Sequence, residues 1–348
     1  MKYVTLKDVC TINMGQSPDS DSYNDNGEGV PFFQGNADFG ERYPVTRKWC
    51  SAPTKMAAPE DILISVRAPI GAMNYAKEEC CIGRGLAALT PDKTKVSPKF
   101  IFWLLKGKNA ELNSKGTGST FKAIGRKVLE ETKVPDISLE KQLEHSETLE
   151  KIYAVIQHRK SELQMLDDLI KARFVEMFNL SDCIYKSLGE CTDFVDYRGH
   201  TPELSDEGII RMVNAKSVGK GFFKYVDEFV TEETYDAWMH RGFGYPGDIL
   251  FVTEGHTFGN TCLIPEDMTK FALGQRVITI KGKEEIKNAF LCSYMQTDMF
   301  WKDINVYRTG GTAQGIRSKD LVKVMVPIPP IEQQIEFVRF VHKVDKSK

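Results

Sequence analysis

Two carboxylates and a lysine come nearest to a catalytic pattern in this 348-residue chain. Pro91-Asp92 lies upstream of Glu131-Thr132-Lys133, and such groups occur at hydrolytic sites where carboxylates hold a metal ion that activates water. Motifs of two or three common residues arise often by chance. An internal repeat, described below, places Lys323-Val324-Met325 where the first copy has Glu131-Thr132-Lys133. The sequence therefore gives little support to hydrolysis by this chain.

The other residue patterns that catalysis requires are missing from the sequence. It has no GxGxxG after a strand, no HExxH and no GxSxG, and Gly219-Lys220 lacks the upstream glycine of a P-loop because position 214 is Asn214. An Asn-Pro-Pro-Tyr motif, with which adenine methyltransferases hold a flipped base, is also missing. The six histidines occur singly, at positions 145, 158, 200, 240, 256 and 342. We expect no enzymatic activity, no metal ion and no cofactor in this chain.

The eight cysteines are spread along the chain without any CxxC pair. They stand at positions 10, 50, 80, 81, 183, 191, 262 and 292. A chain of this length does not need disulfides for stability, so we expect free and mostly buried thiols. The N-terminus lacks the features of a signal peptide, and no window approaches the length of a membrane span. These features predict a cytoplasmic protein without a membrane segment.

The charge is unevenly distributed although the formal net charge is only −2. Residues 84–133 hold eleven Lys or Arg against four acids, and residues 270–323 hold ten against five. These two basic zones stand out from an acidic remainder, as the surface of a nucleic-acid-binding protein would. A solvated, salt-bridged surface explains the same charges equally well.

The chain contains an internal duplication. Pro59-Glu60-Asp61-Ile62-Leu63 is repeated as Pro246-Gly247-Asp248-Ile249-Leu250, 187 residues later, and each copy reads as a turn that leads into a buried strand. Gly116-Thr117-Gly118-Ser119-Thr120 is repeated as Arg308-Thr309-Gly310-Gly311-Thr312, 192 residues later. Pro135 and Gln142 recur as Pro327 and Gln334 at the same separation. A separation that drifts so little indicates duplication with small loop insertions.

Each copy predicts a globular head of mixed α and β structure, and each head is followed by a helix. The opening elements are residues 6–9 and 188–191, and helical stretches follow at 100–106 and 289–296. After Pro135, Ser138 can cap a long helix in which apolar residues recur every three or four positions. The seam of this helix comprises Leu149, Ile152, Ile156, Arg159, Leu163, Leu166, Ile170, Arg173 and Met177. Such a seven-residue period is typical of a coiled coil, so the helix requires a helical partner.

These features together resemble the specificity subunit of type I restriction-modification enzymes. The most telling segments are Lys323–Gln334, its weaker copy Lys133–Gln142, and Leu166–Phe178 at the end of the first helix. The resemblance implies an α+β fold with two tandem target recognition domains, whose helical spacers pair as an antiparallel coiled coil. The expected boundaries are 1–136 for recognition domain 1, 137–180 for the central spacer, 181–328 for recognition domain 2 and 329–348 for a short C-terminal spacer.

The resemblance also implies a function without catalysis. Each head is expected to read one half of a bipartite, asymmetric site in double-stranded DNA, and the spacers to bind modification subunits, two in number. S-adenosylmethionine would then belong to the modification subunits, and ATP and Mg²⁺ to restriction and translocation subunits. A spacer of about forty residues is about 60 Å long as a helix, against roughly 34 Å per turn of DNA. The second spacer has room for only about four turns against some eleven in the first.

The basic zones and the two repeated Gly/Thr loops, Gly116–Thr120 and Arg308–Thr312, supply the candidate DNA-binding residues. Arginine, lysine and glutamine on loops can contact bases, while hydroxyl groups can bind phosphates. In the first head they are Arg84, Lys115, Ser119, Thr120, Lys122 and Arg126; in the second they are Arg276, Arg308, Thr309, Thr312, Gln314 and Arg317. Two alternatives remain open at this point, a catalytic nuclease or fused restriction enzyme and a two-headed scaffold that does not bind DNA. The scaffold predicts DNA affinity that is absent or indifferent to sequence.

Overall fold

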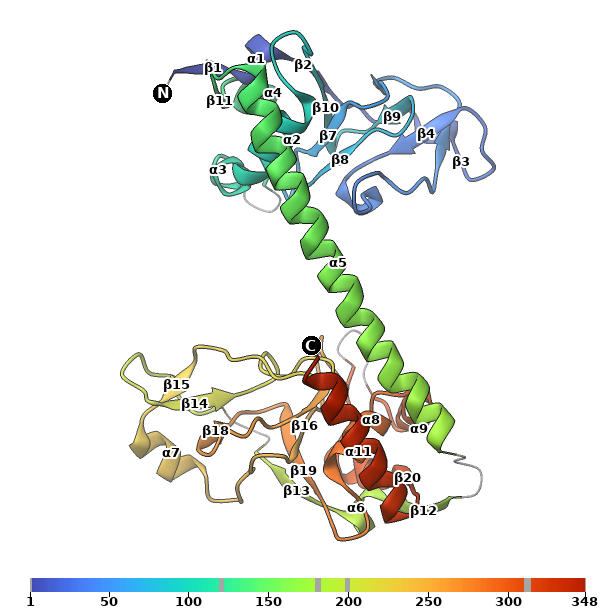
Figure 1. Ribbon diagram of the computed structural model, residues 1–348, viewed down its shortest axis with the longest axis vertical. Coiled ribbons are helices and arrows are strands. Elements are labelled where there is room, and N and C mark those ends of the chain that lie inside the picture. The colour runs from blue at the N-terminus through green and yellow to red at the C-terminus, as the bar shows by residue number, and fades with distance from the viewer. Residues whose placement is uncertain (1, 119–121, 179–182, 198–200, 310–313, 348) are drawn as a thin grey trace. The chain divides into compact units, whose positions relative to one another are not determined.

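The computed structural model describes residues 2–118, 122–178, 183–197, 201–309 and 314–347. The chain divides into two compact units, Met1–His158 (unit 1) and Arg159–Lys348 (unit 2). The division falls inside helix α5 (Leu139–Met177), so each unit includes one part of that helix. Figure 1 labels most of the elements along the chain.

Unit 1 combines three sheets with short helices. Its helices are α1 (Leu6–Val9), α2 (Pro98–Gly107), α3 (Asn109–Ser114), α4 (Arg126–Glu130) and the first part of α5. Its strands are β1 (Tyr3–Thr5), β2 (Cys10–Met14), β3 (Tyr23–Asn24), β4 (Val30–Phe33), β5 (Trp49–Cys50), β6 (Met56–Ala57), β7 (Ile62–Ser65), β8 (Met73–Tyr75), β9 (Cys80–Ile82), β10 (Leu86–Pro91) and β11 (Lys133–Pro135). Within the described residues the strand orders are β1-β11, β2-β10-β7-β8 and β3-β5-β4-β9-β6.

Unit 2 repeats this architecture. Its helices are α6 (Leu188–Cys191), α7 (Glu232–Trp238), α8 (Asn288–Tyr294), α9 (Asp298–Val306), α10 (Ser318–Leu321) and α11 (Ile331–Asp345). Its strands are β12 (Ile184–Ser187), β13 (Thr192–Asp196), β14 (Ile210–Val213), β15 (Phe229–Val230), β16 (Ile249–Val252), β17 (Thr261–Leu263), β18 (Phe271–Leu273), β19 (Val277–Gly282) and β20 (Met325–Ile328). The described strands pair in the orders β12-β20, β13-β19-β16-β17 and β15-β14-β18. The first two orders match those of unit 1 strand for strand, and the third matches the β5-β4-β9 part of the five-stranded sheet of unit 1. This agreement confirms the duplication and the mixed α and β class.

The repeated sequence motifs occupy equivalent places in the two units. Both copies of the Pro-x-Asp-Ile-Leu motif lead into a fully buried strand, β7 or β16. The carboxylate of Asp61 accepts a hydrogen bond from the Ala58 backbone N–H at 2.9 Å, and that of Asp248 accepts one from Tyr245 at 3.0 Å. Each aspartate thereby closes the turn before its strand.

The opening helices also form in the same way. At the start of α1, the Thr5 backbone N–H donates to the Asp8 carboxylate at 2.8 Å; at the start of α6, Ser187 donates to Glu190 at 2.8 Å. Both are capping boxes, which satisfy the free N–H groups of a helix start. Hydrogen bonds from the Thr5 and Ser187 side chains hold the pKa values of Asp8 and Glu190 below their usual range.

A buried glutamine joins each head to the helix that follows it. In unit 1 the Gln142 Oε1 atom accepts from the Ser97 N–H at 2.9 Å, and its Nε2 atom donates to the Ile137 and Lys95 carbonyls at 2.9 and 3.3 Å. Both Gln142 and its counterpart Gln334 are buried, with 2% and 0% of their surface exposed. The equivalent bonds explain why these two residues recur at the same separation in the sequence.

In unit 2 the same three bonds are made by Gln334. Its Oε1 atom accepts from the Lys287 N–H at 2.8 Å, and its Nε2 atom donates to the Pro329 and Glu285 carbonyls at 2.8 and 3.0 Å. We expect Gln334→Met to lower the free energy of unfolding by about 2 kcal/mol, because buried backbone groups lose their partners. Urea denaturation followed by circular dichroism measures this change.

The adjacent Gln333 provides the control for this prediction, because it is exposed on the same turn of α11. Gln333→Met should change stability by less than about 0.5 kcal/mol. Equal effects of the two substitutions would show that the buried hydrogen bonds of Gln334 do not hold α11 to its head.

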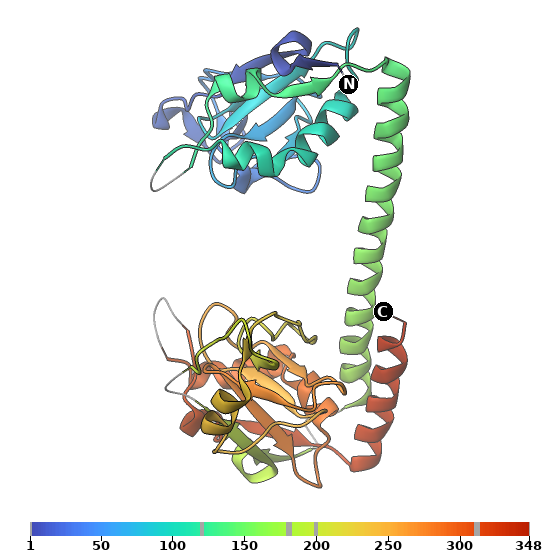
Figure 2. The ribbon, with the colours of Figure 1, turned by 90° about the vertical axis from the view of Figure 1, so that its left-hand side faces the viewer.

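Helix α11 packs against the C-terminal part of α5 within unit 2, as Figure 2 shows. The rings of Phe174 and Phe337 meet at 5.4 Å, and Asp167 and Asp345 line one pocket further along the two helices. Residue numbers rise along α11 as they fall along α5, so the two helices run antiparallel, as predicted.

The predicted coiled-coil seam of α5 is covered only in part. Ile170 and Met177 pack against the core of unit 2. Leu149, Ile152 and Ile156 are 40%, 51% and 45% exposed. The seam therefore continues beyond the part that α11 covers. Among the described residues, no helix has both the length and the apolar composition of a membrane span.

Candidate nucleic-acid interface

Several strand ends and one loop meet at one edge of unit 1. This edge, which we call loop edge 1, is formed by the segments that follow β2, β4, β7 and β9 and by the Gly/Thr loop. It comprises residues 15–17, 34–36, 66–68, 83–85 and 115–124 without 119–121. Backbone hydrogen bonds connect the segments. The N–H of Gly15 donates to Leu86 at 2.9 Å, that of Val66 to Gly85 at 2.9 Å, and that of Gly85 to Gln34 at 3.2 Å.

The approach of two of these segments requires glycine. A Cβ atom added to Gly15 would lie 2.2 Å from the Gly83 carbonyl oxygen, which is closer than any side chain tolerates. The glycines before and after Arg84 thus allow backbone to pack on backbone, and the arginine side chain is left exposed.

The Gly/Thr loop of unit 1 is closed as a hairpin. Thr117 and Ala123 exchange two backbone hydrogen bonds of 2.9 Å each. The Ala68 N–H donates to the Lys122 carbonyl at 3.0 Å, and the Ile124 N–H donates to the Val66 carbonyl at 2.9 Å. These bonds place the described part of the loop beside the residues that follow β7.

Unit 2 has an equivalent edge, which we call loop edge 2: residues 214–216, 253–256, 274–276, 308–309 and 314–317. Thr309 and Gly315 exchange backbone hydrogen bonds of 2.8 and 3.0 Å, as Thr117 and Ala123 do. The Thr253 N–H donates to the Arg276 carbonyl at 2.8 Å, which corresponds to the bond between Val66 and Gly85. The two edges thus share one backbone arrangement.

The side chains on the two edges differ. Arg67 lies two residues after the end of β7 and bridges Ala123, and Glu254 holds the corresponding position in unit 2, where it bridges Gly315. Glu254 pairs with Arg276 at 3.1 Å, and both side chains are about half exposed. Arg276 has a φ of 69°, a left-handed conformation that is uncommon outside glycine. Loop edge 1 is therefore the more basic, and loop edge 2 presents Arg276 beside a carboxylate.

The sequence-predicted residues fall into three groups. Arg84 and Lys122 lie on loop edge 1; Arg276, Arg308, Thr309, Gln314 and Arg317 lie on loop edge 2; all of these are exposed except the half-buried Gln314. Lys115 is the first residue of the 115–124 segment of loop edge 1, and Arg126 begins helix α4 just beyond that edge. Ser119, Thr120 and Thr312 lie outside the described residues.

Several of these residues already have partners on the protein. Lys115 pairs with Glu111 at 2.7 Å, and Arg126 pairs with Glu130 at 3.5 Å. Hydrogen bonds from Lys108 and Lys115 lower the pKa of Glu111 to about 2. Arg308 donates to the Asn305 side chain at 3.2 Å. Exposed pairs of this kind are weak and can be exchanged for a phosphate.

Three residues of loop edge 1 were not predicted from the sequence: Gln16, Gln34 and Arg67, all exposed. Gln16 belongs to Gly15-Gln16-Ser17-Pro18, which recurs as Gly199-His200-Thr201-Pro202. This repeat would have identified the segment after β2, although Gly199 and His200 lie outside the described residues. Arg67 lies two residues after the end of a repeated strand, so an alignment of the two copies also locates it.

The carboxylates first considered for catalysis each have a partner close by in the sequence. Asp92 accepts hydrogen bonds from Thr94, whose backbone N–H lies at 3.0 Å, and Glu131 pairs with Lys127 at 3.8 Å. In the part of the chain that the structure describes, no group of three or more His, Cys, Asp or Glu is placed to hold a metal ion. All eight cysteines are free thiols, as predicted, and only Cys183 is not fully buried.

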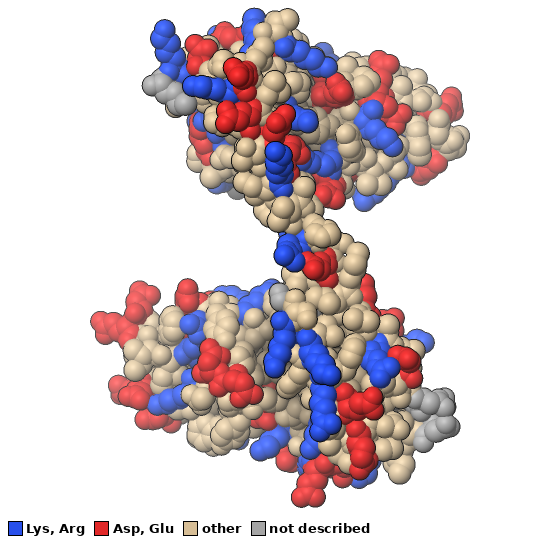
Figure 3. Space-filling view, viewed as in Figure 1, with Lys and Arg blue, Asp and Glu red and all other residues tan. Residues whose placement is uncertain are grey.

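Charges of both signs are interspersed on the face shown in Figure 3, over both units. Lys and Arg do not gather there in one large patch. Charge alone therefore does not locate a nucleic-acid interface on that face. The shared backbone arrangement of the loop edges is the more specific signal.

The chain is similar to known specificity proteins. A family model described as the type I restriction modification DNA specificity domain matches residues 1–165 and 196–348. A putative type I restriction enzyme MjaX specificity subunit from Methanocaldococcus jannaschii is 44% identical over 156 residues, which cover 45% of this chain and 37% of that protein. The crystal structure of the HsdS subunit from Thermoanaerobacter tengcongensis is 43% identical and covers 46% of this chain and 39% of its own, with a TM-score of 0.43.

The S subunit of a type I restriction-modification system from M. genitalium has the same fold, with a TM-score of 0.56. That comparison covers 99% of this chain and 89% of the other at 17% identity. The chain spans about two fifths of the length of the Methanocaldococcus and Thermoanaerobacter proteins. Since the family model matches most of both units, the chain belongs to the type I restriction-modification DNA specificity family.

Proposed function

We propose that this chain is the DNA-specificity subunit of a type I restriction-modification complex and that each loop edge reads one half of a bipartite DNA site. The observation that carries this proposal is the duplicated edge itself: one backbone arrangement presents different side chains in the two units. Because the two edges present different side chains on the same backbone arrangement, they would select two different half-sites. The whole DNA site would then be asymmetric.

Side chains on the two edges have the chemistry that base reading requires. Arginine binds guanine through two hydrogen bonds and glutamine binds adenine in the same way, while lysine and hydroxyl groups hold phosphates. Arg67, Arg84 and Gln16 in unit 1, and Arg276 and Gln314 in unit 2, are of these types. The backbone bonds between segments fix the positions from which these side chains extend.

Catalysis in such a complex belongs to other subunits. Modification subunits would bind S-adenosylmethionine and methylate adenine, and restriction subunits would use ATP and Mg²⁺. We propose that α5 and α11 bind two modification subunits, in the cytoplasm. The exposed apolar residues Leu149, Ile152 and Ile156 support a protein partner for α5, because an apolar stripe of this kind is characteristic of an interaction site.

Selection from random duplexes tests the proposal. The chain is assembled with a type I modification subunit, and the bound DNA is sequenced after several rounds of selection. We expect two short, unlike blocks separated by a gap of fixed length. Enrichment of one continuous block, or of no sequence although the complex binds DNA, would contradict the proposal.

Removal of one arginine from loop edge 2 should weaken recognition at one half-site. We expect Arg276→Ala to reduce affinity for the selected site by about 10-fold, since a bidentate contact to a base is worth about 1–3 kcal/mol. Fluorescence anisotropy at fixed salt measures the affinity. Lys270→Ala is the control, because it removes an equal charge at the other end of strand β18, outside loop edge 2. An equal loss in both variants would indicate a general effect of charge.

A further inference from the structure

Arg42 connects the head of unit 1 to helix α5. Arg42 lies at the tip of a hairpin, pairs with Glu150 of α5, and has its guanidinium 4.4 Å from the ring centre of Tyr153 and 5.2 Å from that of Trp103. The Trp103 indole N–H donates to the same Glu150 carboxylate at 2.8 Å. We call this group the arginine clamp: Arg42, Phe102, Trp103, Glu150 and Tyr153.

The hairpin that carries Arg42 has a counterpart in unit 2. Phe39 pairs with Pro44, and Val218 pairs with Phe223, as isolated bridges between antiparallel segments. The turns inside these bridges have the same length and the same backbone hydrogen bond, from Gly40 to Tyr43 at 3.1 Å and from Gly219 to Phe222 at 2.8 Å. Arg42 is the third residue after Phe39, and Gly221 is the third residue after Val218. Gly221 therefore holds the position of Arg42 in unit 2.

The buried glutamines align the rest of the clamp. Ser97 and Lys287 give their N–H groups to Gln142 and Gln334, so Phe102 and Trp103 on α2 correspond to Cys292 and Ser293 on α8. Counting along the following helices from the glutamines, Glu150 corresponds to His342 and Tyr153 to Asp345. Four of the five replacements put a smaller side chain in unit 2, namely Gly221, Cys292, Ser293 and Asp345.

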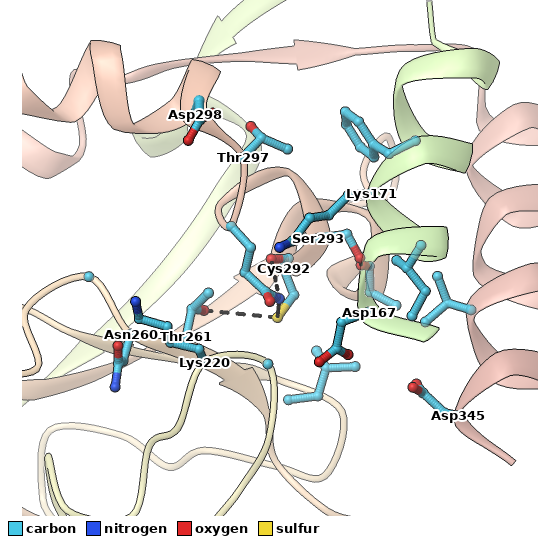
Figure 4. Close-up of a pocket in the computed structure, with 18 of the residues that line it drawn as sticks. Asp167, Lys171, Lys220, Asn260, Thr261, Cys292, Ser293, Thr297, Asp298 and Asp345 are labelled. Atoms are coloured by element: carbon cyan, nitrogen blue, oxygen red, sulfur yellow. Dashed lines mark hydrogen bonds between the residues drawn. The ribbon is translucent and has the colours of Figure 1, made fainter. Parts of the chain in front are cut away.

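A pocket of about 520 Å³ occupies this place in unit 2. Gly221, Cys292, Ser293, His342 and Asp345 all line it. The pocket is therefore the space that the clamp fills in unit 1. Further wall comes from α5, including Asp167, Ile170 and Lys171, and from residues on or beside β17 and α9. Figure 4 shows Asp167 and Lys171 extending from α5 toward Cys292 and Ser293 on α8.

The lining of the pocket favours a cation. Asp167, Asp298 and Asp345 supply three carboxylates, against Lys171 and Lys220, and Lys171 pairs with Asp168 at 3.4 Å. The pKa of the Cys292 thiol is raised to about 12, mainly by burial. The negative charge of Asp345 adds a smaller increase to this pKa. The rings of Phe174 and Trp301 add aromatic surface of the kind on which a guanidinium stacks.

We propose that this pocket binds an arginine side chain presented by a partner polypeptide, which thereby completes in trans the clamp that Arg42 completes in unit 1. The size supports a polypeptide, because pockets of about 300–1,000 Å³ hold ligands larger than one side chain. The arginine would enter with its flanking residues. The proposal is independent of DNA recognition, since none of the pocket residues lies on a loop edge.

Short peptides test the chemistry of the pocket on the full chain. The probes are acetyl-Gly-Arg-Gly-amide, the same peptide with lysine, and the same peptide with citrulline, which has the shape of arginine without its charge. We expect the arginine peptide to bind at least about 10-fold more tightly than the other two, with shifts of the Ile170 and Val341 methyl signals in NMR spectra. Equal binding of the citrulline peptide would overturn the proposal. So would equal binding of acetyl-arginine amide alone, which would point to a small guanidinium compound.

Two variants locate the binding site. Asp345→Asn removes a carboxylate at the surface end of α11 and should weaken the arginine peptide by about 10-fold, a loss of about 1.4 kcal/mol. Ser293→Trp restores the residue of the unit 1 clamp and should fill the pocket and abolish binding. Asp206→Asn, at an exposed position outside the pocket, is the matched control. If the Asp345→Asn protein is folded and binds the arginine peptide as tightly as the control, the proposal is wrong.

Discussion

Replacement of Arg67, Arg84 and Lys122 together by alanine is expected to lower affinity for the cognate site by at least about 100-fold. The three side chains lie on three segments of loop edge 1 that backbone hydrogen bonds hold side by side. Each cation that meets a phosphate contributes about one unit to the slope of log affinity against log salt, and a base contact contributes about 1–3 kcal/mol. We therefore expect the slope to fall by one to three units and preference at one half-site to disappear.

The matched control removes the same charge from the same unit. Lys77, Lys93 and Lys127 are exposed and lie outside loop edge 1. Their replacement by alanine should leave preference at both half-sites intact and change affinity only through the general field of the protein. Anisotropy titrations at several salt concentrations separate the two variants. If the control triple loses as much affinity as the edge triple, loop edge 1 is not the DNA-reading surface.

Loss of the arginine clamp should have the largest effect on stability. We expect Arg42→Ala to lower the free energy of unfolding of unit 1 by about 3 kcal/mol, because it leaves the partly buried Glu150 without its cation and removes the contact to three rings. Arg42→Lys should recover only part of this loss, since lysine lacks the planar guanidinium. Urea denaturation with tryptophan fluorescence reports the change through Trp103.

Arg47 offers a control for the clamp, because it is exposed and its guanidinium donates only to a backbone carbonyl, that of Ala37 at 3.1 Å. Arg47→Ala should change stability by less than about 0.5 kcal/mol. A shift of less than about 1 kcal/mol for Arg42→Ala would mean that the glutamine bonds and the core alone hold α5 to the head. That result would also weaken the interpretation of the unit 2 pocket as an unfilled clamp.

The duplication and its main elements could be predicted from the sequence. The opening elements predicted at Leu6–Val9 and Leu188–Cys191 are short helices, because a capping residue precedes each one. The strands after the two Pro-x-Asp motifs, the start of α5 after Ser138 and the buried thiols are also confirmed. Family membership follows the resemblance of the repeated segments, and the family model confirms it. The domain boundaries and the DNA-binding residues stay predictions.

The loop edges could not be derived from the sequence because they depend on pairing between distant segments. Gly15 meets Gly83, and Val66 meets Gly85 and Ile124, only once the sheets have formed. The clamp was missed for a related reason. The two copies differ by loop insertions, so the correspondence of Arg42 with Gly221 becomes visible only through the hairpin bridges.

The apolar seam of α5 is buried only in part, although its sequence predicts a helical partner along the whole seam. Heptad spacing predicts that a helix has a partner but does not identify the partner. Within unit 2, α11 covers the seam near Ile170 and Met177, whereas Leu149, Ile152 and Ile156 are exposed. A modification subunit bound along α5 would account for these three residues in the proposed complex.

The central claim is that the two loop edges read the two halves of one site. Its most direct test is to co-express the chain with the modification subunit and to map adenine methylation across the host genome by single-molecule sequencing. The wild-type chain should give one bipartite motif with unlike halves. A chain with alanine at Arg276, Gln314 and Arg317 on loop edge 2 should alter or lose one half of the motif and keep the other. A continuous motif, or changes in both halves, would contradict the claim.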